Sequence, residues 1–145
     1  MDFLNYVNLL MGTNSVKTYS NGNVSPIAAL PFGMNNYTLE TRADSDFLFF
    51  NPNDHQTTGV RPTHQLSPWL GDYGVIAMLP TSENNVDFSP LRASGYIKEK
   101  STFKPDFLSF NFLRYRTEIS LVPTMRGAAG NIIYHKKSAS KRLFL

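Results

Sequence analysis

The residues best suited to chemistry lie close together in residues 63–73. Sugars present apolar C–H faces and a ring of hydroxyl groups, so a site that binds them combines an aromatic platform with amide and carboxylate partners. In this segment Trp69 supplies the platform, and Pro68 and Gly71 on either side of it would fix its presentation. The candidate sugar-binding side chains are therefore Trp69, His64, Gln65 and Asp72.

Each of these residues also has a purely structural interpretation. A lone tryptophan in a small β-rich domain is more often a core anchor than a ligand platform. Asp72 beside Gly71 could equally cap a turn, and His64 and Gln65 could satisfy backbone groups before a strand. Ser67 completes the residue types of a hydrolase triad, but the three side chains lie too close in sequence and the Gly-x-Ser-x-Gly elbow is missing. We therefore set the triad aside.

Composition narrows the class of protein that must position these residues. The chain has 145 residues, of which 41% are hydrophobic, which suits one globular domain. It contains no cysteine, so disulfides and thiolate metal sites are excluded. The three histidines, His55, His64 and His135, are scattered, which argues against a zinc site. We assign no metal-binding and no catalytic residue in this chain.

The charge distribution argues against nucleic acid and membrane partners. The formal charge is +3, but four basic residues lie within the last ten, and the remaining ten basic and eleven acidic side chains nearly balance. The N-terminus lacks a basic region followed by an apolar run, and no apolar run reaches the roughly 20 residues that span a bilayer. We expect a soluble cytoplasmic chain that binds neither nucleic acid nor membrane.

Short apolar runs separated by Gly, Pro and Asn predict a mostly β fold. Helical spacing in residues 2–11 predicts one short helical turn that Gly12 ends. Alternating apolar residues in 108–112 and 118–122, joined by a turn at 113–115, predict an antiparallel hairpin. We expect an antiparallel β-sandwich. The predicted strands are 35–40, 47–50, 73–79, 96–100, 108–112, 118–122 and 131–135.

Several segments carry a family resemblance. Residues 6–13 resemble the Tyr-Val-Asn-Pro-Phe-Ile-Gly-Thr opening of family-92 glycoside hydrolases, with Leu9 and Leu10 in place of Pro-Phe. Residues 22–35 resemble the family's Gly-Asn-x-x-Pro and Leu-Pro-Phe-Gly-Met stretch, and residues 63–80 carry its most specific segment, around Trp69. The resemblance covers nearly the whole chain.

Two further residues belong to segments that share this resemblance. Phe32 stands between Pro31 and Gly33, which shape the backbone, so we assign Phe32 a structural role. Arg126 lies in residues 122–129, which resemble the family's Thr-Pro-Thr-Glu-Arg-Ala-Ala segment. Arg126 could pair with a carboxylate such as Glu118 or with a substrate, and we expect the structural pair.

The resemblance implies a fold and an activity for the intact protein. It implies that residues 1–145 form a single β-sandwich domain, or part of one, packed on a larger helical-barrel catalytic domain absent from this chain. The intact enzyme would be a bacterial, calcium-dependent exo-α-mannosidase, an α-1,2-mannosidase, that removes terminal mannose from mannose-containing glycans with inversion. The catalytic acid and base and the calcium ligands would belong to the C-terminal catalytic domain. We therefore expect this chain to be inactive alone, with Trp69 contacting mannose.

The chain ends on Leu143-Phe144-Leu145, which looks like the middle of a strand, so we expect a truncated piece of a larger protein.

The alternative function is a stand-alone carbohydrate-binding β-sandwich without hydrolytic activity. A reading frame that continues for several hundred residues would favour the mannosidase, and a natural stop codon would favour the alternative.

Overall fold

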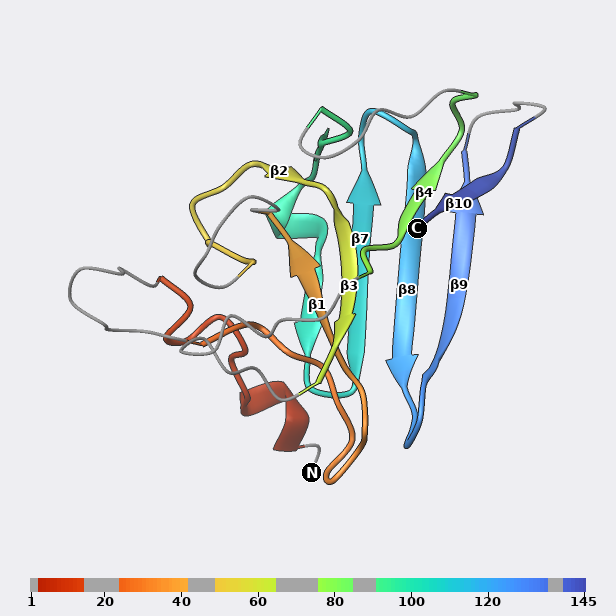
Figure 1. The fold of residues 1–145 in the computed structure, drawn as a ribbon. Coiled ribbons are helices and arrows are strands. Elements are labelled where there is room, and N and C mark those ends of the chain that lie inside the picture. Colours follow the sequence, from red (N-terminus) through yellow and green to blue (C-terminus); the bar gives the residue numbers. More distant parts are fainter. Residues whose placement is uncertain (1–2, 15–23, 42–48, 65–75, 85–90, 136–139) are drawn as a thin grey trace.

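The fold is built almost entirely from antiparallel strands (Figure 1). The computed structural model describes residues 3–14, 24–41, 49–64, 76–84, 91–135 and 140–145. Every strand pair among these residues is antiparallel. The predicted fold class, a mostly β antiparallel sandwich, is confirmed.

The larger layer is a four-stranded meander in the order β6-β7-β8-β9. Its centre is the hairpin of β7 and β8, in which Phe110 lies opposite Ile119. The turn at residues 113–116 closes with Arg116 in the left-handed region at φ 49°, as four-residue hairpin loops commonly require. The strands predicted at 108–112, 118–122 and 131–135 are confirmed. Their observed bounds are β6 Thr102–Lys104, β7 Phe107–Phe112, β8 Thr117–Pro123 and β9 Ala128–Tyr134.

The second layer consists of two short ribbons that a single bridge connects. One ribbon pairs β1 with β3, and the other pairs β4 with β10. Val60 and Met78 exchange backbone hydrogen bonds of 2.8 and 2.7 Å between the ribbons. Gly59 makes this approach possible, because its φ is 145° and a Cβ there would lie 2.6 Å from the Met78 carbonyl oxygen. The bounds are β1 Asn36–Glu40, β3 Gly59–Thr63, β4 Leu79–Thr81 and β10 Arg142–Phe144.

Short elements complete the described chain. β2 (Gln56–Thr57) pairs with β5 (Ser94–Gly95), and the predicted N-terminal helical turn is a 3₁₀ helix, η1 (Phe3–Tyr6). The prediction of a strand at 96–100 is wrong, because η3 (Lys98–Lys100) forms there and the Ser101 hydroxyl bonds back to the Ile97 carbonyl oxygen. The strand predicted at 35–40 is confirmed as β1, and the remaining two, 47–50 and 73–79, fall partly outside the described residues.

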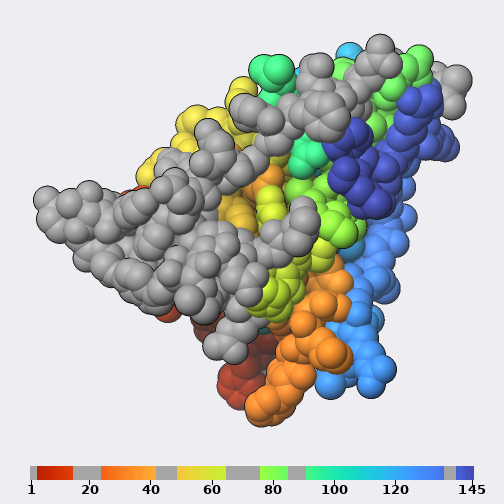
Figure 2. Space-filling model, in the orientation of Figure 1, coloured from red at the N-terminus to blue at the C-terminus, as the bar shows by residue number. Residues whose placement is uncertain are grey.

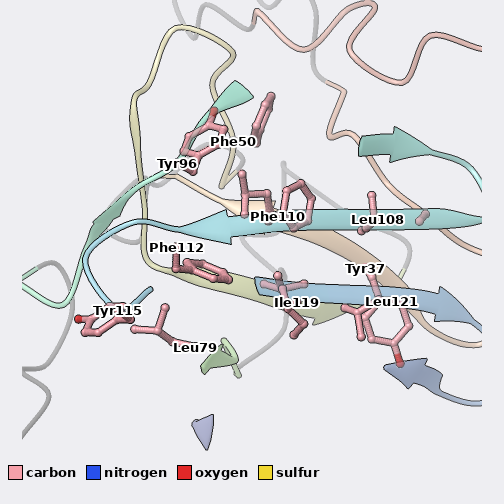
Figure 3. Close-up of a cluster of buried hydrophobic side chains, with 13 residues drawn as sticks. Tyr37, Phe50, Leu79, Tyr96, Leu108, Phe110, Phe112, Tyr115, Ile119 and Leu121 are labelled. Carbon is pink, nitrogen blue, oxygen red and sulfur yellow. The ribbon is translucent and has the colours of Figure 1, made fainter. Parts of the chain in front are cut away.

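The core lies between the two layers (Figure 3). Leu108, Phe110 and Ile119 of the meander pack in one buried cluster with Leu39 and Val60 of the β1–β3 ribbon. Burial of one such side chain contributes about 1.5–3 kcal/mol, so this cluster is the main source of stability. Within the described residues, no helix combines the length and hydrophobicity that a bilayer crossing requires.

Candidate functional site

The four candidate sugar-binding residues differ in what the structure says of them. Trp69, Gln65 and Asp72 lie outside the described residues, so their roles stay predictions. His64 directly follows β3, and its side chain is exposed. The end of β3 therefore places His64 where a ligand can reach it.

The face of the β1–β3 ribbon opposite the core is polar. Tyr37 and Leu39 of β1 and Val60 of β3 belong to the buried cluster, so the residues that alternate with them point the other way. Residues directly opposite each other in an antiparallel pair share a face. The side chains that form this polar face are Asn36, Thr38, Glu40, Arg61 and Thr63.

Glu40 is the only buried acidic side chain among the described residues, with an exposed fraction of 0%. Its Oε1 accepts a hydrogen bond from the Thr58 hydroxyl, and its Oε2 contacts both Nε and Nη2 of Arg61. A buried carboxylate is costly unless it is both paired and hydrogen-bonded, and Glu40 meets both conditions. Its carboxylate therefore acts as a fixed anion that orients Arg61.

Two arginines lie around this carboxylate. The Arg61 guanidinium lies 4.5 Å from the centre of the Phe49 ring, and the Arg92 guanidinium lies 5.1 Å from that of Phe144. Arg92 is only 8% exposed. Burial lowers the pKa of Arg92, the charge of Glu40 raises it, and the charge of Arg61 lowers it again. In the part of the chain that is described, this cluster thus holds two guanidinium groups and one carboxylate.

Two polar atoms at this cluster are buried without a hydrogen-bond partner in the described chain. They are Oγ1 of Thr38, which is paired with Arg61 in the strand register, and Nε of Arg92. Native proteins leave few buried polar groups unsatisfied, so each such atom calls for an explanation. The Arg92 nitrogen can only donate, so it lacks an oxygen acceptor among the described residues.

A polar groove lies beside this face, where β1 ends. Thr41 follows Glu40, and its hydroxyl donates to Oδ2 of Asp54 at 2.7 Å. The groove has a volume of about 440 Å³. Its lining offers hydroxyl, amide, carboxylate and imidazole groups, which match the hydroxyl groups of a saccharide. The lining residues are Thr41, Asn53, Asp54, His55 and Gln56.

A second groove, of about 380 Å³, shares three lining residues with the first and adds Tyr96. The Tyr96 hydroxyl donates to the Asp54 carbonyl oxygen at 3.1 Å. Burial, followed by the charges of Asp54 and Glu99, raises the pKa of Tyr96 to about 12. Tyr96 is therefore a neutral donor at physiological pH, and it fixes the backbone between the two grooves.

The described residues supply neither a glycosidase acid–base pair nor a calcium site. A carboxylic acid that stays protonated at neutral pH needs a buried, unpaired setting, and the one buried acid, Glu40, is paired with Arg61. No group of three or more His, Asp or Glu side chains gathers as metal ligands among the residues described.

Sequence reasoning missed the Glu40–Arg61 pair, and it assigned Glu118 the wrong partner. Glu118, expected to pair with Arg126, lies instead 3.7 Å from Nε2 of His135, because the register of β8 and β9 brings the end of β9 beside it. Arg126 lies in the β8–β9 turn, where its side chain is exposed. These pairings depend on strand register, which the spacing of residues along the chain did not reveal.

Comparison with known families decides the class of this domain. Residues 6–145 match the model described as the glycosyl hydrolase family 92 N-terminal domain. The chain belongs to this family. No curated protein matches the chain in the corresponding sequence comparison.

Solved structures agree with this assignment. The family-92 domain aligns with a family GH92 inverting mannosidase from Bacteroides thetaiotaomicron at a TM-score of 0.81 and 32% identity, over 94% of this chain and 18% of that one. A family GH92 α-mannosidase from the same organism, in complex with mannoimidazole, aligns at a TM-score of 0.75 and 23% identity, over 92% and 18% of the two chains. The latter match shows the fold alone. The chain spans about a fifth of the length of these mannosidases.

Proposed function

We propose that this family-92 domain is the N-terminal part of a calcium-dependent, inverting exo-α-mannosidase, specific for α-1,2 linkages, that acts on mannose-containing glycans. The observation that carries the proposal is the match of residues 6–145 to the family's N-terminal domain. The structural similarity to an inverting mannosidase supports it. The domain would support the mannose pocket and supply one wall of it, while the catalytic domain would supply the chemistry.

The chemistry of inversion explains this division of labour. One carboxylic acid protonates the leaving oxygen, and one carboxylate activates water on the opposite face of the sugar, about 6.5–9.5 Å away. The only buried carboxylate among the described residues, Glu40, is committed to Arg61 and Thr58. The domain's own contribution would be substrate contacts from Trp69, His64, Gln65 and Asp72.

The first test compares the intact protein with the 145-residue chain on α-1,2-linked mannobiose, each with calcium and with a chelator. We expect mannose release only from the intact protein with calcium present, with β-mannose as the first-formed anomer, because inversion converts the α configuration of the substrate to β. Turnover by the purified 145-residue chain would show that the catalytic groups had been assigned to the wrong domain.

The second test concerns Trp69 in the intact protein. A stacking platform is worth about 1–3 kcal/mol, so Trp69→Ala should lower kcat/KM by one to two orders of magnitude with little change in melting temperature. A core tryptophan would instead leave a cavity that costs about 3–5 kcal/mol of stability. Loss of stability with near-normal activity at low temperature would contradict the mannose contact and indicate that Trp69 is a core residue.

His64 permits a matched comparison with a second exposed histidine. We expect His64→Ala to raise KM for the mannoside because an exposed donor at the end of β3 is lost. His135→Ala, after β9, is the control for removal of an exposed imidazole. Equal effects of the two substitutions would contradict the assignment of His64 to the mannose pocket.

A further inference from the structure

The turn that precedes β1 presents a phenylalanine in an unusual way. Phe32 is 99% exposed, and its φ of 61° places it in the left-handed backbone region. That region is costly for a bulky residue, and such strain is found preferentially where a protein binds something. Phe32 thus keeps a strained backbone while its ring remains in solvent, so a structural role within this chain does not account for it.

Backbone contacts hold this turn in place. The Gly33 amide donates to the Leu30 carbonyl oxygen at 2.9 Å, and a Cβ at Gly33 would come within 3.1 Å of that oxygen. The Met34 amide donates to the Met125 carbonyl oxygen at 2.8 Å, which ties the turn to the one between β8 and β9. The ring of Phe32 is therefore presented from a fixed backbone.

The two turns that meet here expose further apolar side chains. Met34 and Met125, whose backbones are bonded to each other, expose 66% and 53% of their surface. The orange segment before β1 and the blue β8–β9 turn lie at the same projecting end of the molecule (Figures 1 and 2). We call Phe32, Met34 and Met125 the apolar knob.

We propose that the apolar knob is a docking anchor, and that the ring of Phe32 inserts into an apolar pocket on the larger part of the intact protein. The chain spans 18% of the mannosidase that it resembles at 32% identity, so most of such a protein is available as a partner. An aromatic side chain presented from a rigid turn has the features of an interface hot spot, because little entropy is lost on binding. This inference rests on the proposed function only for the existence of that larger part.

The chemistry of the knob favours a protein pocket over a sugar. A sugar site needs hydrogen-bond partners around its aromatic platform. The neighbours of Phe32 in the knob are methionines, whose flexible apolar side chains suit an irregular protein surface. Asn35 and Arg126 lie on the same turns, but the Asn35 amide already donates to the Arg126 carbonyl oxygen, whereas the groove around Asp54 gathers several polar groups.

The test uses the intact protein and four substitutions at Phe32. Phe32→Ala removes the ring, Phe32→Gly removes the ring and relieves the backbone strain, Phe32→Leu keeps an apolar side chain, and Phe32→Tyr keeps an aromatic face. Native-state proteolysis between the domains is measured, because its rate follows the population of the open form. The KM for α-mannosides is measured on the same variants.

Two substitutions serve as controls. Leu91→Ala removes another exposed apolar side chain, which is 73% exposed and lies outside the knob. Arg116→Gly relieves strain at the other non-glycine residue of positive φ among those described, at φ 49°, without removing a ring. The two controls separate docking from general loss of apolar surface and from strain relief.

We expect Phe32→Ala and Phe32→Gly to raise the proteolysis rate about 10- to 100-fold, the factor that corresponds to burial of one large apolar side chain. Phe32→Leu should retain most of the protection, and the two controls should change the rate less than about threefold.

Unchanged proteolysis in both Phe32→Ala and Phe32→Gly would overturn the proposal. A raised KM in Phe32→Leu, with normal proteolysis and rescue by Phe32→Tyr, would overturn it in favour of sugar stacking. Absence of mannosidase activity in the wild type would refute the proposed function but leave the proteolysis result interpretable.

Discussion

The Glu40–Arg61 pair allows a sharp test of what stabilises the polar face. Glu40→Gln preserves the shape of the side chain and removes only its charge. The change leaves the guanidinium of Arg61 without its carboxylate and beside that of Arg92, in a site where Glu40 is 0% and Arg61 13% exposed. Both remaining charges are then poorly solvated and repel each other.

The expected cost follows from that burial. Removal of one partner of a buried ion pair costs about 3–5 kcal/mol, because the other charge remains buried and uncompensated. At about 4 °C per kcal/mol for a domain of this size, the melting temperature should fall by roughly 12–20 °C. Domains are stable by only about 5–15 kcal/mol, so this loss is a large share of the free energy of unfolding. The variant should therefore unfold at a lower urea concentration than the wild type.

Urea and thermal unfolding, followed by circular dichroism, measure this loss. The matched control is Glu83→Gln, which removes the carboxylate of an exposed pair 3.3 Å from Arg114. Exposed pairs contribute about 0–1 kcal/mol, so the control should shift the melting temperature by no more than about 4 °C. If Glu40→Gln costs no more than Glu83→Gln, the buried pair is not a stabilising feature and the reasoning is refuted.

Three further substitutions test the fold. Gly59→Ala should destabilise by more than about 1 kcal/mol in urea unfolding, because φ is 145° and the new Cβ would meet the Met78 carbonyl oxygen. Phe110→Ala, at a fully buried position, should cost about 3–5 kcal/mol in the same assay. The raised pKa of Tyr96 makes the folded state retain a proton that the unfolded state releases, so stability is complete below pH 10 and falls by roughly 2–3 kcal/mol as the pH rises to about 12. Tyr96→Phe should abolish that fall, and a pH profile identical to that of the wild type would assign it to another group.

The strands that could be predicted are those with an uninterrupted period of two. In β7, Leu108, Phe110 and Phe112 alternate with polar residues, and the pattern itself gives the strand and its buried face. β3 escaped prediction because Gly59 and Pro62 are residues that ordinarily interrupt strands. Here Gly59 is required by the approach to residue 78, which lies far away in sequence.

The candidate site, like the fold, could be predicted only in part from the sequence. The residue types suited to a sugar could be named from the sequence, and the exposure of His64 agrees with that expectation. The pairing of Glu40 with Arg61 could not, because it depends on which strand lies beside β1 and in which register. Phe32 was assigned a structural role because Pro31 and Gly33 indicate a turn, but the sequence does not show on which side of a turn a ring points.

The pairing of β4 with β10 has a consequence for how the chain folds. β6 to β9 are consecutive in sequence, so their hairpins close short loops, whereas β10 pairs with a strand about sixty residues earlier. Closure of a longer loop costs more entropy, and contacts distant in sequence form more slowly. The meander should therefore form first, and its apolar face should remain exposed to water until the second layer packs on it. During that interval the nascent chain would be most prone to aggregate, and the time to close the β4–β10 ribbon would set how long that risk lasts.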